Sequence, residues 1–101
     1  MEEQLLGNCM RLMVMENLTA NHIHSHKDKV EELLNSDLRF NEVVLDLSRV
    51  MNIDSVGVTF VIGLYKRIDG LTKKFSVAGA SEDIIRLFKL RKLDQFFNIN
   101  S

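Results

Sequence analysis

The chain has 101 residues, of which 46% are hydrophobic, and its formal net charge is −1. This length fits a single compact domain spanning residues 1–101, with a hydrophobic core. The charge argues against nucleic acid as a ligand, because binding to a phosphate backbone needs a concentration of Lys and Arg. The longest apolar run, Val56 to Tyr65, is shorter than the roughly twenty residues of a membrane span. We therefore expect no direct nucleic-acid binding and no membrane span.

A lone cysteine, Cys9, cannot form an internal disulfide, which favours a reducing compartment. The N-terminal stretch "MEEQLLGN" is acidic where a signal peptide is basic, so we expect a cytoplasmic location. The charge is uneven: residues 1–50 carry five Lys/Arg against nine Asp/Glu, and residues 51–101 carry eight against five. Such polarity can orient a protein partner during encounter, or it can simply solvate helix faces.

The first half of the chain predicts two strands and a helix. "EQLL" before Gly7-Asn8 predicts a short strand, paired through a tight turn with a second strand near residues 9–15, where apolar residues alternate. Thr19 or Asn21 is then expected to cap a helix, since apolar residues recur at helical spacing up to Asn35.

The second half predicts two strands and two helices. "VVLDL", residues 43–47, is a nearly continuous apolar run that predicts a strand covered on both faces. A helix follows and ends near Asp69-Gly70, and "KFSVAG" predicts a strand closed by Gly79. Ser81 is expected to cap the next helix, and the tail "LDQFFNI" to form a last helical turn or a lid on the core.

The order β-β-α-β-α-β-α predicts an α/β fold. Strands joined by helical crossovers lie parallel, so we expect a mixed, mostly parallel sheet of about four strands layered with about three to four helices. In such sheets the functional residues lie beyond the carboxyl ends of the strands. Ser55 occupies that position, between the "VVLDL" strand and the following helix.

Three interpretations of Ser55 are open. A serine nucleophile on a strand-to-helix turn needs G-x-S-x-G, but Ile53 replaces the first glycine and all three histidines precede the serine, so we expect no catalytic residue. Ser55 could instead cap the helix through its hydroxyl. Third, a phosphate at this helix start would change the fold's stability little, whereas a dianion in a protein interface costs several kcal/mol of binding.

A docking surface beside Ser55 would favour the third interpretation. If Gly57, Phe60 and the residues in line with them face the sheet, Val58 and Ile62 fall on another side of the helix, where a surface helix normally carries charge. The alternative is a helix buried all round by the C-terminal segment.

The stretch "VVLDLSRVMNIDSVGVTFVIGLYKRI" resembles the core motif of STAS domains, in particular small stand-alone anti-sigma factor antagonists. In these a strand ending in Asp-Leu precedes a loop, Asp-Ser-x-Gly and an apolar helix. "FSVAGASEDIIRLFKLRKLDQFFNI" is similar to the family's final strand, capped helix and tail, so the resemblance covers about residues 9–99.

The resemblance implies a phosphorylation switch. In this family the serine at the position of Ser55 is phosphorylated by an anti-sigma factor that is also a serine kinase, and a metal-dependent serine phosphatase removes the phosphate. The unphosphorylated form binds the anti-sigma factor and releases the sigma factor. The partner-binding residues expected here are Leu18, Thr19, Asp54, Ser55, Val56, Gly57, Val58 and Ile62.

The chain also departs from the family pattern. It has Glu16-Asn17-Leu18-Thr19 where the family shows Gly-x-Leu-Asp, and Val56 where members often carry a second serine or an alanine. Thr59 is a second hydroxyl that could accept phosphate. The same fold also occurs in constitutive scaffolds and in subunits of stress-signalling or lipid-transport complexes, which is the alternative function.

The cluster "HIHSH" suggests metal binding at first sight. On a helix, His22 and His26 share a side while His24 points nearly opposite, so only two ligands converge. We therefore expect no metal site and no cofactor.

Overall fold

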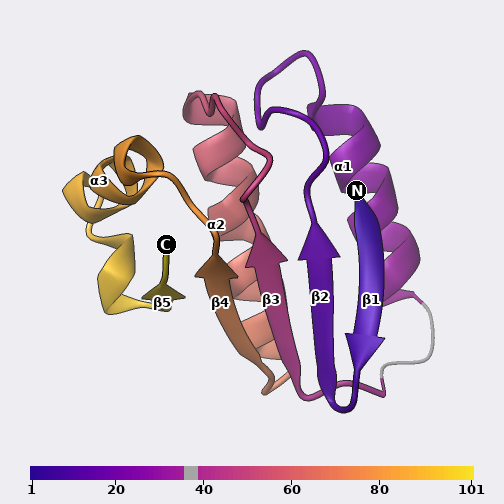
Figure 1. Ribbon diagram of the computed structural model, residues 1–101. Coiled ribbons are helices and arrows are strands. Elements are labelled where there is room, and N and C mark those ends of the chain that lie inside the picture. The colour runs from indigo at the N-terminus through magenta and orange to yellow at the C-terminus, as the bar shows by residue number, and fades with distance from the viewer. Residues whose placement is uncertain (36–38) are drawn as a thin grey trace.

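The computed structural model describes residues 1–35 and 39–101, whose strands form one five-stranded sheet (Figure 1). The strands follow the chain order across the sheet, and only β1 is antiparallel to its neighbour. The α/β class and the element order predicted from the sequence are confirmed. The elements are β1 (Glu2–Leu6), β2 (Cys9–Met13), α1 (Ile23–Leu34), β3 (Glu42–Asp46), α2 (Ser55–Gly70), β4 (Lys74–Ala78), α3 (Glu82–Leu90), a 3-10 turn (Leu93–Gln95) and β5 (Asn98–Ile99).

Two chain segments differ from the prediction. The tail forms a 3-10 turn and then β5, which pairs parallel with β4. Leu93 and Phe97 are buried as a lid would be, whereas Phe96 is exposed. The cap residue of α1 is His22, not Thr19 or Asn21, and it makes no side-chain capping bond. The reason is that the preceding loop is held by contacts to the start of α2, which are described below.

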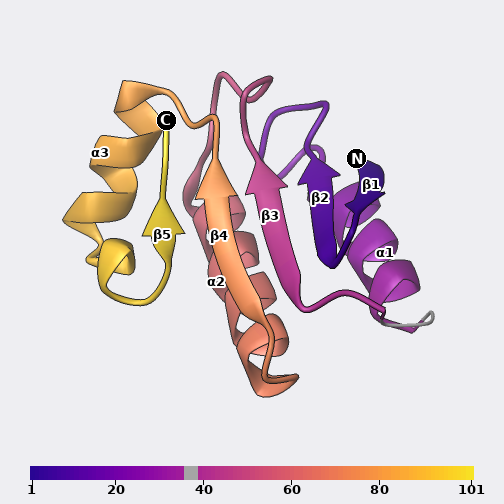
Figure 2. The same ribbon diagram turned by 60° about the horizontal axis from the view of Figure 1, so that its bottom comes forward.

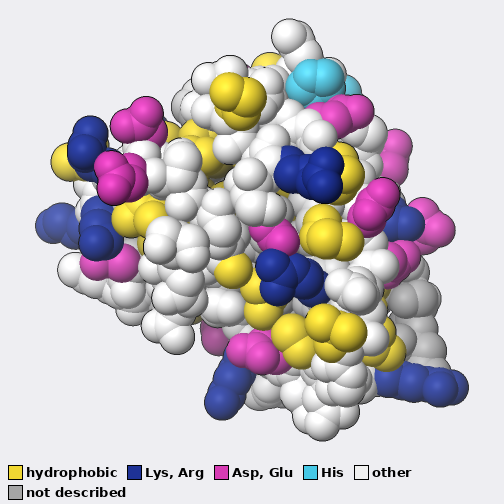
Figure 3. Space-filling model, viewed as in Figure 1, with side chains coloured by type: hydrophobic (Ala, Val, Ile, Leu, Met, Phe, Trp, Pro, Cys, Tyr) yellow, Lys and Arg dark blue, Asp and Glu magenta, His cyan; other side chains and the backbone are white. Residues whose placement is uncertain are grey.

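Helices α1 and α2 both cover one face of the sheet (Figures 1 and 2). Side chains that alternate along the central strands fill the core on this face, among them Leu12, Val43, Leu45 and Val77. On the opposite face Val44 is only half-buried, so the prediction that this strand is covered on both faces is wrong. Figure 3 shows this helix-free face, where apolar side chains and charges of both signs are interspersed.

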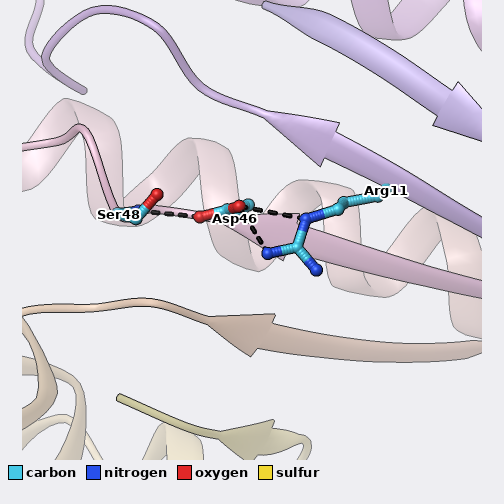
Figure 4. Close-up of polar contacts among 3 residues, drawn as sticks. All are labelled: Arg11, Asp46 and Ser48. Carbon is cyan, nitrogen blue, oxygen red and sulfur yellow. Dashed lines mark hydrogen bonds and ion pairs between the residues drawn. The ribbon is translucent and has the colours of Figure 1, made fainter.

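One ion pair lies on the helix-free face (Figure 4). The Arg11 guanidinium donates from Nε and Nη2 to Asp46 Oδ2, at 3.0 and 2.6 Å, and Ser48 N–H donates to Asp46 Oδ1 at 2.9 Å. Burial alone would raise the pKa of Asp46, but the hydrogen bonds from Ser48 and Arg11 outweigh it and the pKa is lowered. Gly79 has a φ of +72°, and a Cβ at this position would lie 2.9 Å from both Asp46 Oδ1 and Ser48 Cβ, so a side chain there would be strained and crowded.

The parallel pairing of β2 and β3 places the two loops that follow them at the same sheet edge. Val14 N–H donates to Asp46 O at 3.1 Å, which carries the strand pairing on towards these loops. Leu18 and Ile53 then form an isolated parallel bridge between the loops. The start of α2, and with it Ser55, therefore lies against the loop between β2 and α1.

We predict that Arg11→Met lowers the free energy of unfolding at pH 7 by about 1–3 kcal/mol, because it leaves the buried Asp46 carboxylate without its cation. The pKa of Asp46 is lowered by folding, so its contribution is present above the unfolded pKa of about 4 and is lost as the pH falls through the folded value. Urea unfolding at pH 7 and pH 3 measures both effects, and the cost of the substitution shrinks at pH 3.

The matched control is Arg86→Met, which removes an exposed pair with Asp83 whose N–O distance is 3.7 Å. Exposed pairs contribute little, so its cost is expected below about 0.5 kcal/mol. Equal costs for the two variants would contradict the role given to Arg11.

Candidate functional site

The start of α2 is organised by one carboxylate. Asp54 is the cap residue, and its Oδ1 accepts the N–H of Gly57 at 2.9 Å. Its Oδ2 accepts the N–H of Ala20, in the loop before α1, at 3.0 Å. The hydrogen bonds from Ala20 and Gly57 hold the pKa of the Asp54 carboxyl below its ordinary value, so the group is ionised at neutral pH. Asp54 therefore begins the helix and fixes the neighbouring loop at the same time.

Asn17 makes a second connection between the two loops. Its Oδ1 accepts the N–H groups of both Met51 and Asn52 at 3.1 Å. Between them, Leu18 N–H donates to Asn52 O at 3.1 Å and Asp54 N–H donates to Leu18 O at 3.2 Å. The sequence did not predict the two hydrogen bonds of Asn17, because nothing in it pairs residue 17 with residues 34 and 35 positions away. The stretch Glu16-Asn17-Leu18-Thr19 departs from the family pattern. Hydrogen bonds of Asn17 and Leu18 fix it against the loop before α2.

Gly57 allows the close approach of this loop. A Cβ at Gly57 would lie 1.9 Å from Leu18 O and 2.8 Å from Ile53 Cγ1. The first distance is far inside van der Waals contact with backbone, so any side chain at this position must push the loop away. This gives the glycine of the Asp-Ser-x-Gly string a structural reason.

Ser55 is the first residue of α2 and its side chain is exposed. Because Asp54 caps the helix, the interpretation of Ser55 as the cap is wrong. Within the described residues the Ser55 hydroxyl has no hydrogen-bond partner, while its carbonyl accepts from Thr59 Oγ1 at 2.9 Å. The hydroxyl is therefore free to react with an approaching enzyme.

The predicted docking residues separate into a buried, a half-buried and an exposed group. Val58 is 1% exposed and Leu18 is 0% exposed, so both belong to the core and their expected place on a docking surface is wrong. Ile62 is half-buried against the core. The buried face of α2 is wider than the row of residues that was expected to face the sheet. It includes Val58 as well, which is why Val58 is not exposed.

Two apolar residues close to Ser55 in the sequence are exposed, Val56 and Met51. Met51 is 83% exposed, and its backbone N–H is held by Asn17. Sequence reasoning missed Met51, since an isolated methionine in a loop carries no periodic signal. Thr19, at the other side of the site, is half-buried. We define the Ser55 rim as Thr19, Met51, Asp54, Ser55 and Val56.

The three histidines have separate environments. His22 Nδ1 lies 2.9 Å from Glu16, His24 is exposed, and His26 is 1% exposed between α1, α2 and the loop. His26 Nε2 faces Asn17 O at 3.4 Å and its ring lies 6.1 Å from that of Phe60, while its Nδ1 has no partner among the described residues. In residues 1–35 and 39–101 no three His, Cys, Asp or Glu side chains are grouped as a metal site.

We predict that Gly57→Ala lowers the free energy of unfolding by about 1–3 kcal/mol or more, because its methyl group collides with Leu18 O. Gly63→Ala in the same helix is the control. Apart from the backbone of its own helix and its two neighbours in the chain, no atom of the described residues lies within 4 Å of a Cβ at Gly63, so this variant should be more stable than the wild type by about 0.5–1 kcal/mol. Chemical denaturation compares the two, and a loss of stability in both variants would contradict the role of the loop contact.

We predict that acidification from pH 7 to pH 5 destabilises the fold through His26. Burial lowers the pKa of the His26 imidazole, so the unfolded chain takes up a proton first and stability is lost as the pH falls below about 6.5. The charged groups around it are Glu16, His22 and the N-terminal amine. In thermal unfolding, His26→Leu should flatten this pH dependence and His24→Leu should leave it intact. An unchanged slope in His26→Leu would contradict the assignment.

Comparisons with known proteins identify the family and relatives that share the fold. The model of the family described as "Mlab, STAS domain" matches residues 1–99. The crystal structure of TM1081 from Thermotoga maritima, a candidate anti-sigma factor antagonist, has 26% sequence identity and a TM-score of 0.89, and the match covers 99% of this chain and 85% of that one. No curated protein matches the chain.

The anti-sigma factor antagonist SpoIIAA shares the fold at 14% identity. Its unphosphorylated form has a TM-score of 0.69 over 99% of this chain and 86% of that one. The phosphorylated form of the Bacillus protein has a TM-score of 0.71 over 99% and 89%. No helix in the described part of the chain is both long and apolar enough to cross a membrane. From the family match over nearly its whole length, the chain belongs to the STAS-domain family.

Proposed function

We propose that the chain is a non-catalytic anti-sigma factor antagonist switched by phosphorylation of Ser55. The unphosphorylated form binds an anti-sigma factor that is also a serine kinase, and so releases the sigma factor. The observation that carries the proposal is the exposure of Ser55, which does not cap the helix because Asp54 does, and which is followed by the exposed Val56. A second exposed apolar residue, Met51, precedes it by four positions. The kinase adds the phosphate and a metal-dependent serine phosphatase removes it.

The electrostatics of the Ser55 rim favour a switch on binding. A phosphate adds about 1.5 to 2 negative charges next to the ionised Asp54. The end of the helix attracts this charge by about 0.3–1 kcal/mol, and repulsion from Asp54 offsets part of that gain. The folded state is therefore little affected. An unpaired dianion inside a protein interface costs several kcal/mol, and about 1.4 kcal/mol is already a tenfold loss of affinity.

The similarity to SpoIIAA supports the proposal in one respect. That protein has been solved in an unphosphorylated and a phosphorylated form, and both have the present fold. A phosphate switch is thus compatible with this architecture without a change of fold. At 14% identity the similarity to SpoIIAA shows a common fold, and the phosphorylation of Ser55 is our proposal for this chain.

A second candidate is a constitutive subunit of a stress-signalling or lipid-transport complex. The hydrogen bonds that the N–H groups of Met51 and Asn52 donate to Asn17 favour it, because they hold the two loops together without involving the Ser55 hydroxyl. In this case Ser55 is a contact residue and stays unmodified. An enzyme is the third class, but within the described residues no histidine is hydrogen-bonded to the Ser55 hydroxyl, as a nucleophile would require.

The test is phosphorylation of the intact chain. Incubation with ATP and the anti-sigma factor kinases of the same genome should place phosphate on Ser55, located by mass spectrometry. Ser55→Ala should abolish the modification, and Thr59→Ala, which removes the nearest other hydroxyl on α2, should not. A stable complex that forms without modification would favour the constitutive subunit, and turnover of a substrate lost in Ser55→Ala would favour the enzyme.

We predict that Ser55→Asp weakens binding to that kinase at least tenfold while the free energy of unfolding changes by less than about 0.5 kcal/mol. Ser55→Asn is the neutral control of similar size, and it should bind nearly as the wild type does. Calorimetric titration and chemical denaturation measure the two quantities. A large loss of stability in Ser55→Asp would contradict the claim that the charge acts at the interface.

A further inference from the structure

A groove of about 720 Å³ runs between α1 and α2 on the outer side of the helix layer. Core residues form its floor: Val30 of α1 and Phe60 and Leu64 of α2. The exposed side of α2 lines it with Val56, Thr59 and Gly63, and Ser55 lies at one end. The groove shares Ser55 and Val56 with the Ser55 rim and continues from the rim along the helix.

The shape of the groove fits a helix. Both helices connect parallel strands, so they run in the same direction (Figure 1). Residues of both helices line the groove, which therefore follows the two helices. From Ser55 to Arg67 the channel is twelve residue steps long, or about 18 Å, which a helix of about twelve residues spans. Gly63 is exposed, and among the described residues no other segment lies within 4 Å of the position of its missing Cβ, so a partner helix can approach α2 closely there. Helical walls offer no free strand edge, which disfavours an extended peptide.

The charge of the groove selects the occupant. Its walls carry Lys27, Lys66 and Arg67 against a single anion, Glu31, which gives a local net charge of +2 in a chain of −1. Arg67 and Glu31 pair across the two helices. Lys27 and Lys66 have no ion-pair partner in the described part of the chain. An apolar floor between unpaired cations is complementary to an apolar helix face with Asp or Glu on its flanks.

Ser55 lies where its phosphate would act on such a helix. The phosphate contributes about 1.5 to 2 negative charges, which nearly cancels the +2 of the walls. A bound acidic helix would then meet a like charge at the end of the groove and lose the attraction along its length. The charge of the groove thus explains why phosphorylation of Ser55 would weaken binding and not strengthen it.

We propose that the α1–α2 groove binds an acidic amphipathic helix of the partner protein. The inference rests on the proposed function for the identity of that partner, an anti-sigma factor. It adds that the partner presents an acidic amphipathic helix. The groove and its charge exist whether or not Ser55 is ever phosphorylated, so the two proposals can fail separately.

The test uses two synthetic helical peptides with the same apolar face, one flanked by Glu and the other by Lys. By fluorescence polarisation with the whole chain, the acidic peptide should bind at least tenfold more tightly, and salt should weaken it. The NMR amide signals of Val56, Thr59 and Gly63 should shift. Equal binding of the two peptides, or signals that shift only outside the groove, would overturn the proposal.

Charge reversal supplies the matched variants. Lys27→Glu with Lys66→Glu should lower the affinity for the acidic peptide at least tenfold and improve that for the basic one. Lys89→Glu with Arg91→Glu makes the same change of charge at exposed positions at the end of α3, and should alter the affinity less than threefold. Equal losses of affinity in the two double variants would mean that only the total charge of the protein matters. That result would overturn the proposal that the groove is the binding site.

Two further measurements separate the alternatives. Vesicles of phosphatidylglycerol test an anionic lipid, and binding of vesicles through Lys27 and Lys66 without binding of the acidic peptide would overturn a helical partner. Ser55→Asp should lower the affinity for the acidic peptide at least threefold. If no kinase modifies Ser55 but the peptide results hold, the groove stands and the proposed switch fails.

Discussion

The architecture of the site depends on the contact between the start of α2 and the loop that precedes α1. Asp54 accepts one N–H from its own helix and one from Ala20, and Gly57 lets the Leu18 carbonyl approach where any side chain would collide. One carboxylate and one missing side chain thereby decide where the loop lies. This contact explains the Asp and the Gly of the Asp-Ser-x-Gly string. The Ser55 side chain takes no part in it.

Most of the fold could be predicted from the sequence, because it is encoded locally. Alternation near residues 9–15, the apolar run at 43–47 and the cap at Ser81 each define an element within a few residues. β5 was not predicted, since two residues are too few for a pattern and form a strand only where β4 offers an edge. The open face of the sheet was missed because a run such as "VVLDL" suits a doubly covered strand equally well.

The site was predictable in position but only partly in composition. The order of the elements placed Ser55 at the carboxyl edge of the sheet, and the structure agrees. Asp54 and Ser55 are adjacent residues that could both cap a helix, and only the geometry decides between them. Val58 was misplaced since the buried width of a helix depends on what packs beside it. The bonds of Asn17 to Met51 and Asn52 cross 34 or more positions and leave no trace in local sequence.

The helical setting of Ser55 also restricts the enzyme that could modify it. Drawing this serine out as an extended strand would break the hydrogen bond from Gly57 to Asp54 and disturb the carboxylate that also holds Ala20. A kinase that acts on Ser55 in the native protein must therefore recognise a folded surface with the first helical turn in place. A short linear peptide copied from residues 50–60 would lack that turn and the adjoining loop, and would be a poor substrate.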